Sequence, residues 1–142
     1  MSCPIKLTIP SDSKYLCLAR NTLKMFLDCH KVPEDVACKL MLCLDEACSN
    51  VIKYGYEGKS GQPIEISFEW ENGNLVVKIR DYGKQCDTKK IKPRPLSDIK
   101  PGGLGTHFIF EIMDSVDYCT RFEKGTLLTM CKKLDLTSKP VS

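Results

Sequence analysis

A carboxylate, a carboxamide and an amine recur at helical spacing between residues 46 and 53. Glu46 and Asn50 are four residues apart, and Lys53 is seven residues from Glu46. The three therefore lie within about 60° of arc on one side of a helix. A carboxylate one turn from a carboxamide could act as a base beside a ligand for Mg²⁺, which prefers oxygen donors. Taken alone, the triplet is more typical of the solvent-exposed face of an amphipathic helix.

An aspartate follows a strand-like run in the middle of the chain. Residues 76–80 predict a strand, Asp81 comes directly after it, and Gly83 stands two residues later. A glycine lets the backbone approach a ligand closely, and a buried carboxylate can accept a hydrogen bond from an exocyclic amine such as that of adenine. An Asp-x-Gly turn after a strand is common, however, and taken alone it is the better interpretation.

Glycines also precede the last helical pattern. Gly102, Gly103 and Gly105 surround its first residue, Leu104, and Thr106 follows. Such a run exposes unpaired N–H groups and the positive end of a helix dipole, which together suit an anion or a phosphate. A glycine loop that merely precedes a helix is an equally good interpretation. It is not a Walker motif, because no Gly-Lys-Ser/Thr follows.

Helical and strand-like stretches would position these three segments. The apolar pattern changes from a helical period before Gly55 to strict alternation after Ile64, and Asn72-Gly73 indicates a hairpin. In chain order, we predict a strand at 5–9, helices at 15–27 and 33–55, strands at 64–70 and 75–79, a loop at 83–103, a helix at 104–113, and a hairpin of strands 116–122 and 126–132. The predicted fold is an α/β (α+β) two-layer sandwich, with a mixed, largely antiparallel sheet and helices on one face. One domain would span residues 1–134, followed by a polar tail at 135–142.

Composition limits the class of protein. The chain has 142 residues, of which 42% are hydrophobic and 27% charged, as expected of one globular domain. A net charge of +3 is too mild to indicate direct nucleic-acid binding, although residues 84–100 carry a local +4. The sequence has neither a signal-peptide pattern nor an apolar run of about 18 residues, so we expect a cytoplasmic protein without membrane contact.

Nine cysteines are present, and no two have Cys-x-x-Cys spacing. Cys38, Cys43 and Cys48 are five residues apart, so successive thiols point about 140° apart around a helix and cannot face one metal ion. We therefore expect these three to be small buried hydrophobic residues with reduced thiols.

Taken together, in this order and spacing, the three segments resemble the N box and the two glycine boxes of the GHKL (Bergerat-fold) ATPases. Within this superfamily, the chain most resembles the branch of stand-alone anti-sigma-factor serine kinases. The resemblance spans about residues 5–132 and includes the run Asp45-Glu46-Ala47-x-x-Asn50-x-x-x-x-Gly55-Tyr56 and the Gly-Leu-Gly that opens the last helix. Gly125-Thr126 resembles the Gly-Thr element that closes the adenine pocket of the family.

The resemblance implies a role for each matching residue. Glu46 would be the general base, Asn50 the Mg²⁺ ligand, and Asp81 the acceptor for the adenine amine. Arg20 matches an arginine that the family uses toward partner proteins. The remaining contacts to ATP would come from Lys53, Gly83, Gly103, Leu104, Gly105, Thr106 and Thr126. One position departs from the family pattern, because Gln85 stands where the first glycine box often has its second glycine.

The function implied is that of an anti-sigma factor and ATP-dependent protein serine/threonine kinase. It would bind a sigma factor and phosphorylate a STAS-type antagonist in a partner-switching system, as a homodimer with ATP and Mg²⁺ as cofactors. A base at Glu46 favours a hydroxyl acceptor, because a hydroxyl must lose a proton whereas an imidazole is already a nucleophile. The alternative is a nucleotide-gated anti-sigma or adaptor module without phosphoryl transfer.

Overall fold

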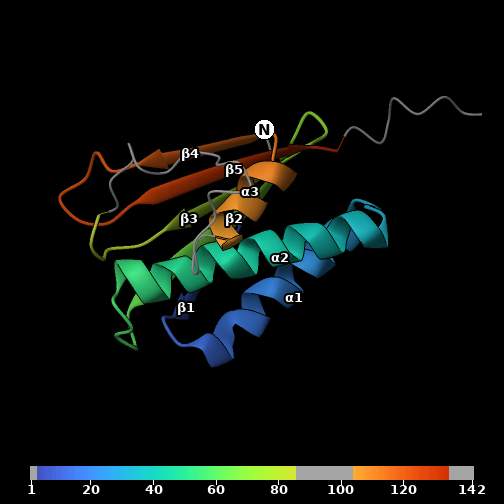
Figure 1. The fold of residues 1–142 in the computed structure, drawn as a ribbon. Coiled ribbons are helices and arrows are strands. Elements are labelled where there is room, and N and C mark those ends of the chain that lie inside the picture. Colours follow the sequence, from blue (N-terminus) through green and yellow to red (C-terminus); the bar gives the residue numbers. More distant parts are fainter. Residues whose placement is uncertain (1–2, 86–103, 135–142) are drawn as a thin grey trace, which may run out of the picture.

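The computed structural model describes residues 3–85 and 104–134. Five strands form one sheet in the order β1-β2-β3-β5-β4, and every pair of neighbours is antiparallel. The strands are β1 (Ile5–Pro10), β2 (Pro63–Glu71), β3 (Asn74–Arg80), β4 (Ser115–Cys119) and β5 (Leu127–Lys133). Three helices, α1 (Leu16–Cys29), α2 (Glu34–Asn50) and α3 (Leu104–Ile112), cover one face of this sheet (Figure 1). The predicted two-layer α/β architecture is confirmed.

The core lies between the sheet and the helices. Alternation along β2 places every second side chain, which is apolar, toward the helices, and Leu75, Val77 and Ile79 of β3 continue this face; the helices close over it with apolar stripes of helical period. The largest fully buried side chains come from both layers: Leu23, Leu27, Leu40 and Leu44 from the helices, and Ile64, Ile66, Phe68, Leu75, Val77, Ile79 and Met130 from the strands. The same periodicities that predict the elements therefore also determine which faces meet.

The β2–β3 hairpin forms where its turn signal predicts. Glu71 pairs with Asn74, so the loop consists of Asn72 and Gly73, whose φ angles are 51° and 80°. Two residues with positive φ match the right-handed twist of the flanking strands, and asparagine and glycine adopt that conformation readily.

The other hairpin is shorter than its prediction. The strand predicted at 116–122 ends at Cys119, which pairs with Leu127, so residues 120–126 form a longer connection. The carbonyls of Thr120 and Phe122 accept hydrogen bonds from the side chain of Gln85 and so do not continue the ladder. A contact from a distant segment ends the strand early.

The second helix also changes before its predicted end. α2 stops at Asn50, and residues Val51–Gly55 form a π-helical turn, η2, in which Tyr56 N donates to Val51 O at 2.8 Å. Single π-helical turns are often found at functional sites. A short 3-10 turn, η1 (Ser13–Tyr15), precedes α1.

The cysteines of α2 divide between core and surface. Cys43 and Cys48 are buried as expected, and burial raises the pKa of each thiol to about 12. The prediction for Cys38 was wrong, because its side chain is exposed. Cys38 lies near the start of α2, and the neighbouring Ala37 and Leu40 fill the buried face there.

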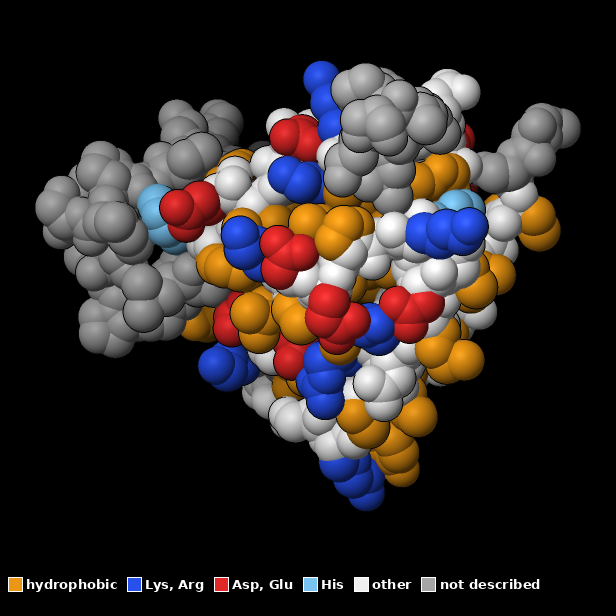
Figure 2. All heavy atoms as spheres, turned by 90° about the vertical axis from the view of Figure 1, so that its right-hand side faces the viewer, with side chains coloured by type: hydrophobic (Ala, Val, Ile, Leu, Met, Phe, Trp, Pro, Cys, Tyr) orange, Lys and Arg blue, Asp and Glu red, His pale blue; other side chains and the backbone are white. Residues whose placement is uncertain are grey.

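Charges of both signs are interspersed on the surface. In the face shown in Figure 2, basic and acidic side chains stand next to one another and no single sign dominates. Lys24, for example, pairs with Asp28 at 2.6 Å and with Glu34 at 3.1 Å. Within the described ranges, no helix is both long enough and apolar enough to span a bilayer.

Candidate nucleotide site

A cavity of about 570 Å³ lies where three segments meet: the end of α2 with η2, the end of β3, and the β4–β5 hairpin. Four of the residues predicted from motifs line it together, namely Asn50, Lys53, Asp81 and Thr126. They come from sequence positions far apart, so the fold brings the predicted elements to one place. The cavity also has lining residues that the motifs did not single out as binding residues, among them Lys84, Gln85 and Tyr118.

Asp81 is the buried acidic residue of this cavity. Only 5% of it is exposed, its Oδ1 accepts a hydrogen bond from Gly83 N at 2.9 Å, and its own N–H donates to Thr126 O at 3.0 Å. Burial raises the pKa of the Asp81 carboxyl, while the Gly83 N–H and the Arg80 charge act in the opposite direction. A fixed, poorly hydrated acceptor of this kind suits an exocyclic amine.

Two glycines allow the chain to close around Asp81. A Cβ on Gly83 would lie 2.3 Å from Gly55 O, and next to this contact Lys84 N donates to the same oxygen at 2.7 Å. Gly125 has a φ of 75°, and a Cβ there would lie 1.9 Å from Asp81 O. Backbone atoms cannot move aside as a flexible side chain can, so both positions require glycine.

A buried tyrosine joins η2 to the end of β3. The Tyr56 hydroxyl donates to Pro63 O at 2.6 Å and accepts from Tyr82 N at 2.8 Å. Burial raises the pKa of this hydroxyl. The prediction from sequence assigned Tyr56 no role, although the Gly-Tyr pair that closes the helical motif was the available signal.

A carboxamide and two cations also line the cavity. Asn50 is the last residue of α2, Lys53 is exposed on η2, and Lys84 is exposed just beyond β3. A carboxamide oxygen is a hard donor that suits Mg²⁺, and two ammonium groups suit the charge of a polyphosphate. The residues present therefore fit a metal–nucleotide complex.

Glu46 lies one turn before Asn50 on α2 and is partly buried. It is not among the described residues that line the cavity. The helical spacing predicted from sequence is present, and its role as a base stays a prediction.

The glycine run is described only in part. Leu104, Gly105 and Thr106 form the first turn of α3, and Gly103 lies outside the described residues, as do residues 86–103 of the predicted loop and the tail at 135–142. A phosphate contact at this helix start therefore also stays a prediction.

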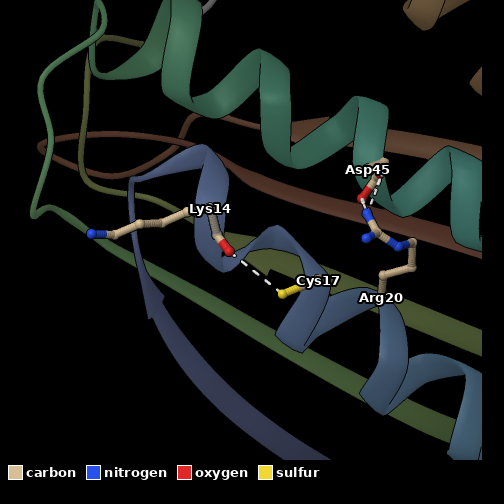
Figure 3. Close-up of polar contacts among 4 residues, drawn as sticks. All are labelled: Lys14, Cys17, Arg20 and Asp45. Carbon is tan, nitrogen blue, oxygen red and sulfur yellow. Dashed lines mark hydrogen bonds and ion pairs between the residues drawn. The ribbon is translucent and has the colours of Figure 1, made fainter.

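Arg20 makes an ion pair with the neighbouring helix. Its Nη1 donates to Asp45 Oδ1 at 3.0 Å and to Oδ2 at 2.8 Å, and Figure 3 shows the pair bridging α1 and α2. The two side chains are 34% and 29% exposed. The prediction from sequence had no partner for Arg20 within the chain, because residues 25 positions apart cannot be paired from helical spacing alone.

A family model for the histidine kinase-like ATPase domain matches residues 9–132. The chain therefore belongs to the histidine kinase-like ATPase domain family, which confirms the superfamily that its motifs predicted.

Its relatives carry the names of the predicted branch. The chain is similar to a serine-protein kinase RsbW from Halalkalibacterium halodurans, with 25% identity over 92% of this chain and 83% of the relative. It is also similar to an anti-sigma F factor from Clostridium botulinum, with 28% identity over 94% of this chain and 96% of the relative.

A solved structure supports the fold. The chain superposes on the structure of the RsbU and RsbW domains of a Mycobacterium tuberculosis protein with a TM-score of 0.67 and 16% identity. The match covers 93% of this chain and 32% of that one, so this chain spans about a third of its length.

Proposed function

We propose that this chain is an anti-sigma factor and an ATP-dependent protein serine/threonine kinase. The observation that supports it most is the set of residues that line one cavity, which includes the buried carboxyl of Asp81 together with Asn50, Lys53 and Lys84. An adenine amine requires an acceptor and a polyphosphate requires cations, and this cavity has both. The names of the relatives, a serine-protein kinase and an anti-sigma factor, point to the same activity.

The residues of the cavity would divide the work of binding. Asp81 accepts a hydrogen bond from the adenine amine, Gly83 orients that carboxylate through its N–H, and Thr126 closes the adenine side. Asn50 holds Mg²⁺, and Lys53 and Lys84 balance phosphate charge. The chemistry supplied by a bound Mg²⁺ is neutralisation and orientation of the phosphates.

Glu46 would act on the protein acceptor. Its carboxylate takes the proton of a serine or threonine hydroxyl while that oxygen bonds to the γ-phosphorus and the bond to the β–γ bridging oxygen breaks. ADP leaves with that bridging oxygen. Most of the acceleration comes from positioning and electrostatics, to which a base adds a smaller factor.

The partners would be a sigma factor and a STAS-type antagonist that carries the phosphorylated hydroxyl, with Arg20 contributing to the protein interface. The chain would act as a cytoplasmic homodimer. Guanidinium groups are favoured at interfaces because they are weakly hydrated and can pair with carboxylates.

Incubation with labelled ATP, Mg²⁺ and each candidate STAS protein from the same genome tests this function. Transfer of label to one serine or threonine of one candidate, mapped by mass spectrometry, is the expected result. Stable complexes with both partners but no label on any candidate would contradict the kinase activity.

A second function has one observation in its favour. Glu46 is not among the described residues that line the cavity, as expected of an adaptor that binds nucleotide without transferring phosphate. The same assay separates the two functions, because an adaptor binds MgATP and the sigma factor but leaves the antagonist unlabelled.

A further inference from the structure

The side chain of Gln85 joins the segment beyond β3 to the connection between β4 and β5. Its Nε2 donates to Thr120 O at 2.9 Å and to Phe122 O at 2.7 Å, so one side chain from beyond β3 holds the backbone of the β4–β5 connection. A primary amide carries two N–H donors on a single nitrogen, which suits two converging carbonyl oxygens. The reverse orientation of the amide would place an oxygen against two oxygens, so the contacts themselves fix the assignment.

The connection that Gln85 holds has little other backbone support. In the part of the chain that the structure describes, residues 120–125 make no backbone–backbone hydrogen bond outside helices and strands. The bond from Asp81 N to Thr126 O and the close approach of Gly125 to Asp81 hold one end of this segment, and side chains hold the rest of it near β3.

Cation–π contacts of Arg80 also join the end of β3 to the β4–β5 connection. The Arg80 guanidinium lies 4.3 Å from the centroid of the Tyr82 ring and 3.9 Å from that of the Phe122 ring. Arg80 Nη1 also donates to Asp81 O. Cation–π contacts of this kind are weak at exposed sites, so they help to orient residues 120–125. The hydrogen bonds of the Gln85 amide set the distance of these residues from β3.

We infer that Gln85 is a positioning residue of the nucleotide site, which holds residues 120–125 of the β4–β5 connection so that Thr126, whose carbonyl accepts from Asp81 N, stays beside Asp81. This inference rests on the proposed function. Gln85, Tyr118 and Thr126 all line the cavity, so a shift of the connection changes the width of the cavity beside Asp81. When only a fraction of molecules has the competent arrangement, the apparent affinity falls by that fraction.

Two substitutions of Gln85 remove its donors in different ways. Gln85→Met keeps the length of the side chain and loses both hydrogen bonds, and Gln85→Glu places a carboxylate against two carbonyl oxygens. Gln62→Glu is the matched control, since the Gln62 amide makes only a 3.5 Å contact to Ser60 O and does not line the cavity.

Hydrogen exchange of the protein without nucleotide gives the first result. For the loss of two solvent-exposed hydrogen bonds we expect the Asp81 amide, which donates to Thr126 O across the end of the connection, to exchange roughly three- to tenfold faster in Gln85→Met. Gln85→Glu should show at least the same increase, and amides of β2 should not change. Unaltered exchange of the Asp81 amide in both variants would overturn the inference.

Calorimetry with MgATP gives the second result. Affinity should fall in Gln85→Met by about the same factor as the exchange increases, and the affinity of the Gln62→Glu control should not change. Faster exchange with wild-type affinity would overturn the positioning role. If the wild-type chain bound no MgATP, the proposed function would fail, while the exchange experiment would still decide whether Gln85 holds the connection.

Discussion

Burial of the Asp81 carboxyl lowers the stability of the fold and provides a group that can bind a ligand. Its carboxyl is 5% exposed, and burial raises its pKa above the ordinary value of 3.8. Between 3.8 and the raised pKa, the folded chain binds more protons at this group than the unfolded chain does. The contribution of Asp81 to the free energy of unfolding therefore falls as the pH rises through this window.

Asp81→Asn should remove this pH-dependent cost. The amide oxygen still accepts from Gly83 N without a charge to desolvate, so we expect the variant to be more stable at pH 7 by about 1 kcal/mol. The advantage should shrink as the pH is lowered toward 4, where the wild-type carboxyl becomes neutral. Urea unfolding of both proteins at several pH values measures it, and a less stable variant with a pH-independent gap would show that burial does not control this group.

Glu46→Gln separates chemistry from binding. The amide keeps the size of the side chain but cannot take a proton, so we expect phosphoryl transfer to fall by roughly 10²–10⁴-fold with MgATP affinity unchanged. Asn50→Ala is the contrasting variant and should weaken Mg²⁺-dependent nucleotide binding itself. Single-turnover transfer at saturating ATP is the measurement, and a near-wild-type rate in Glu46→Gln would show that Glu46 is not the base.

At the scale of elements, α1 and α2 are joined by an ion pair that is also the candidate partner site. The Arg20 and Asp45 side chains are about one-third exposed, so the pair contributes at most about 1 kcal/mol to folding. Either residue can therefore be changed without unfolding the chain.

Arg20→Ala and Asp45→Asn should have opposite effects on partner binding. Loss of the guanidinium should weaken binding of the antagonist or the sigma factor by roughly ten- to a hundredfold. Asp45→Asn releases the guanidinium from its intramolecular partner and should preserve or strengthen binding. Calorimetry measures the affinity of each variant for each partner, with MgATP affinity as the control. Equal weakening by both variants would indicate that the helix pair matters rather than the guanidinium.

The β4–β5 connection depends on a close backbone approach at Gly125. Gly61 is a matched control, because its φ of 77° is similar to the 75° of Gly125 but a Cβ there would have no atom within 4 Å. Gly61→Ala should cost about 1–2 kcal/mol of unfolding free energy from the positive φ alone. Gly125→Ala should cost about 3 kcal/mol or more, because its Cβ also meets the Asp81 backbone. Similar costs from denaturant unfolding of both variants would contradict the close approach.

Local sequence patterns predicted most of the helices and strands. The features that these patterns did not predict depend on contacts between residues far apart in the sequence. The β2–β3 hairpin follows from alternation and Asn72-Gly73, which are properties of adjacent residues. The π-helical turn at Val51–Gly55 and the early end of β4 do not, because they depend on how Gly55 meets Gly83 and how Gln85 meets residues 120–122.

The candidate site shows the same difference between local motifs and long-range contacts. Asn50, Lys53, Asp81 and Thr126 are readable from motifs because the order of the motifs along the chain is specific. The contacts of Tyr56 and the pairing of Arg20 with Asp45 are not, since each joins residues from separate elements. The sequence predicts which residues come together, and the fold shows the contacts that each of them makes.

For the whole molecule, sheet order determines where the cavity can form. β3 is the middle strand of β1-β2-β3-β5-β4, so Asp81 leaves the centre of the sheet between β2 and β5. α2 ends over the same place and brings Asn50 and Lys53 there. A packed two-layer core thus supports, at its edge, a cavity lined by both apolar and polar residues, where glycines allow close backbone contacts.

The central claim is that this cavity binds an adenine nucleotide through Asp81. Calorimetric titration of MgATP into the wild-type chain, Asp81→Asn and the Gly61→Ala control tests it most directly. We expect saturable binding by the wild type and the control, and a roughly ten- to hundredfold loss in Asp81→Asn for one hydrogen bond to a charged acceptor. A folded Asp81→Asn that binds MgATP as tightly as the wild type would contradict the claim.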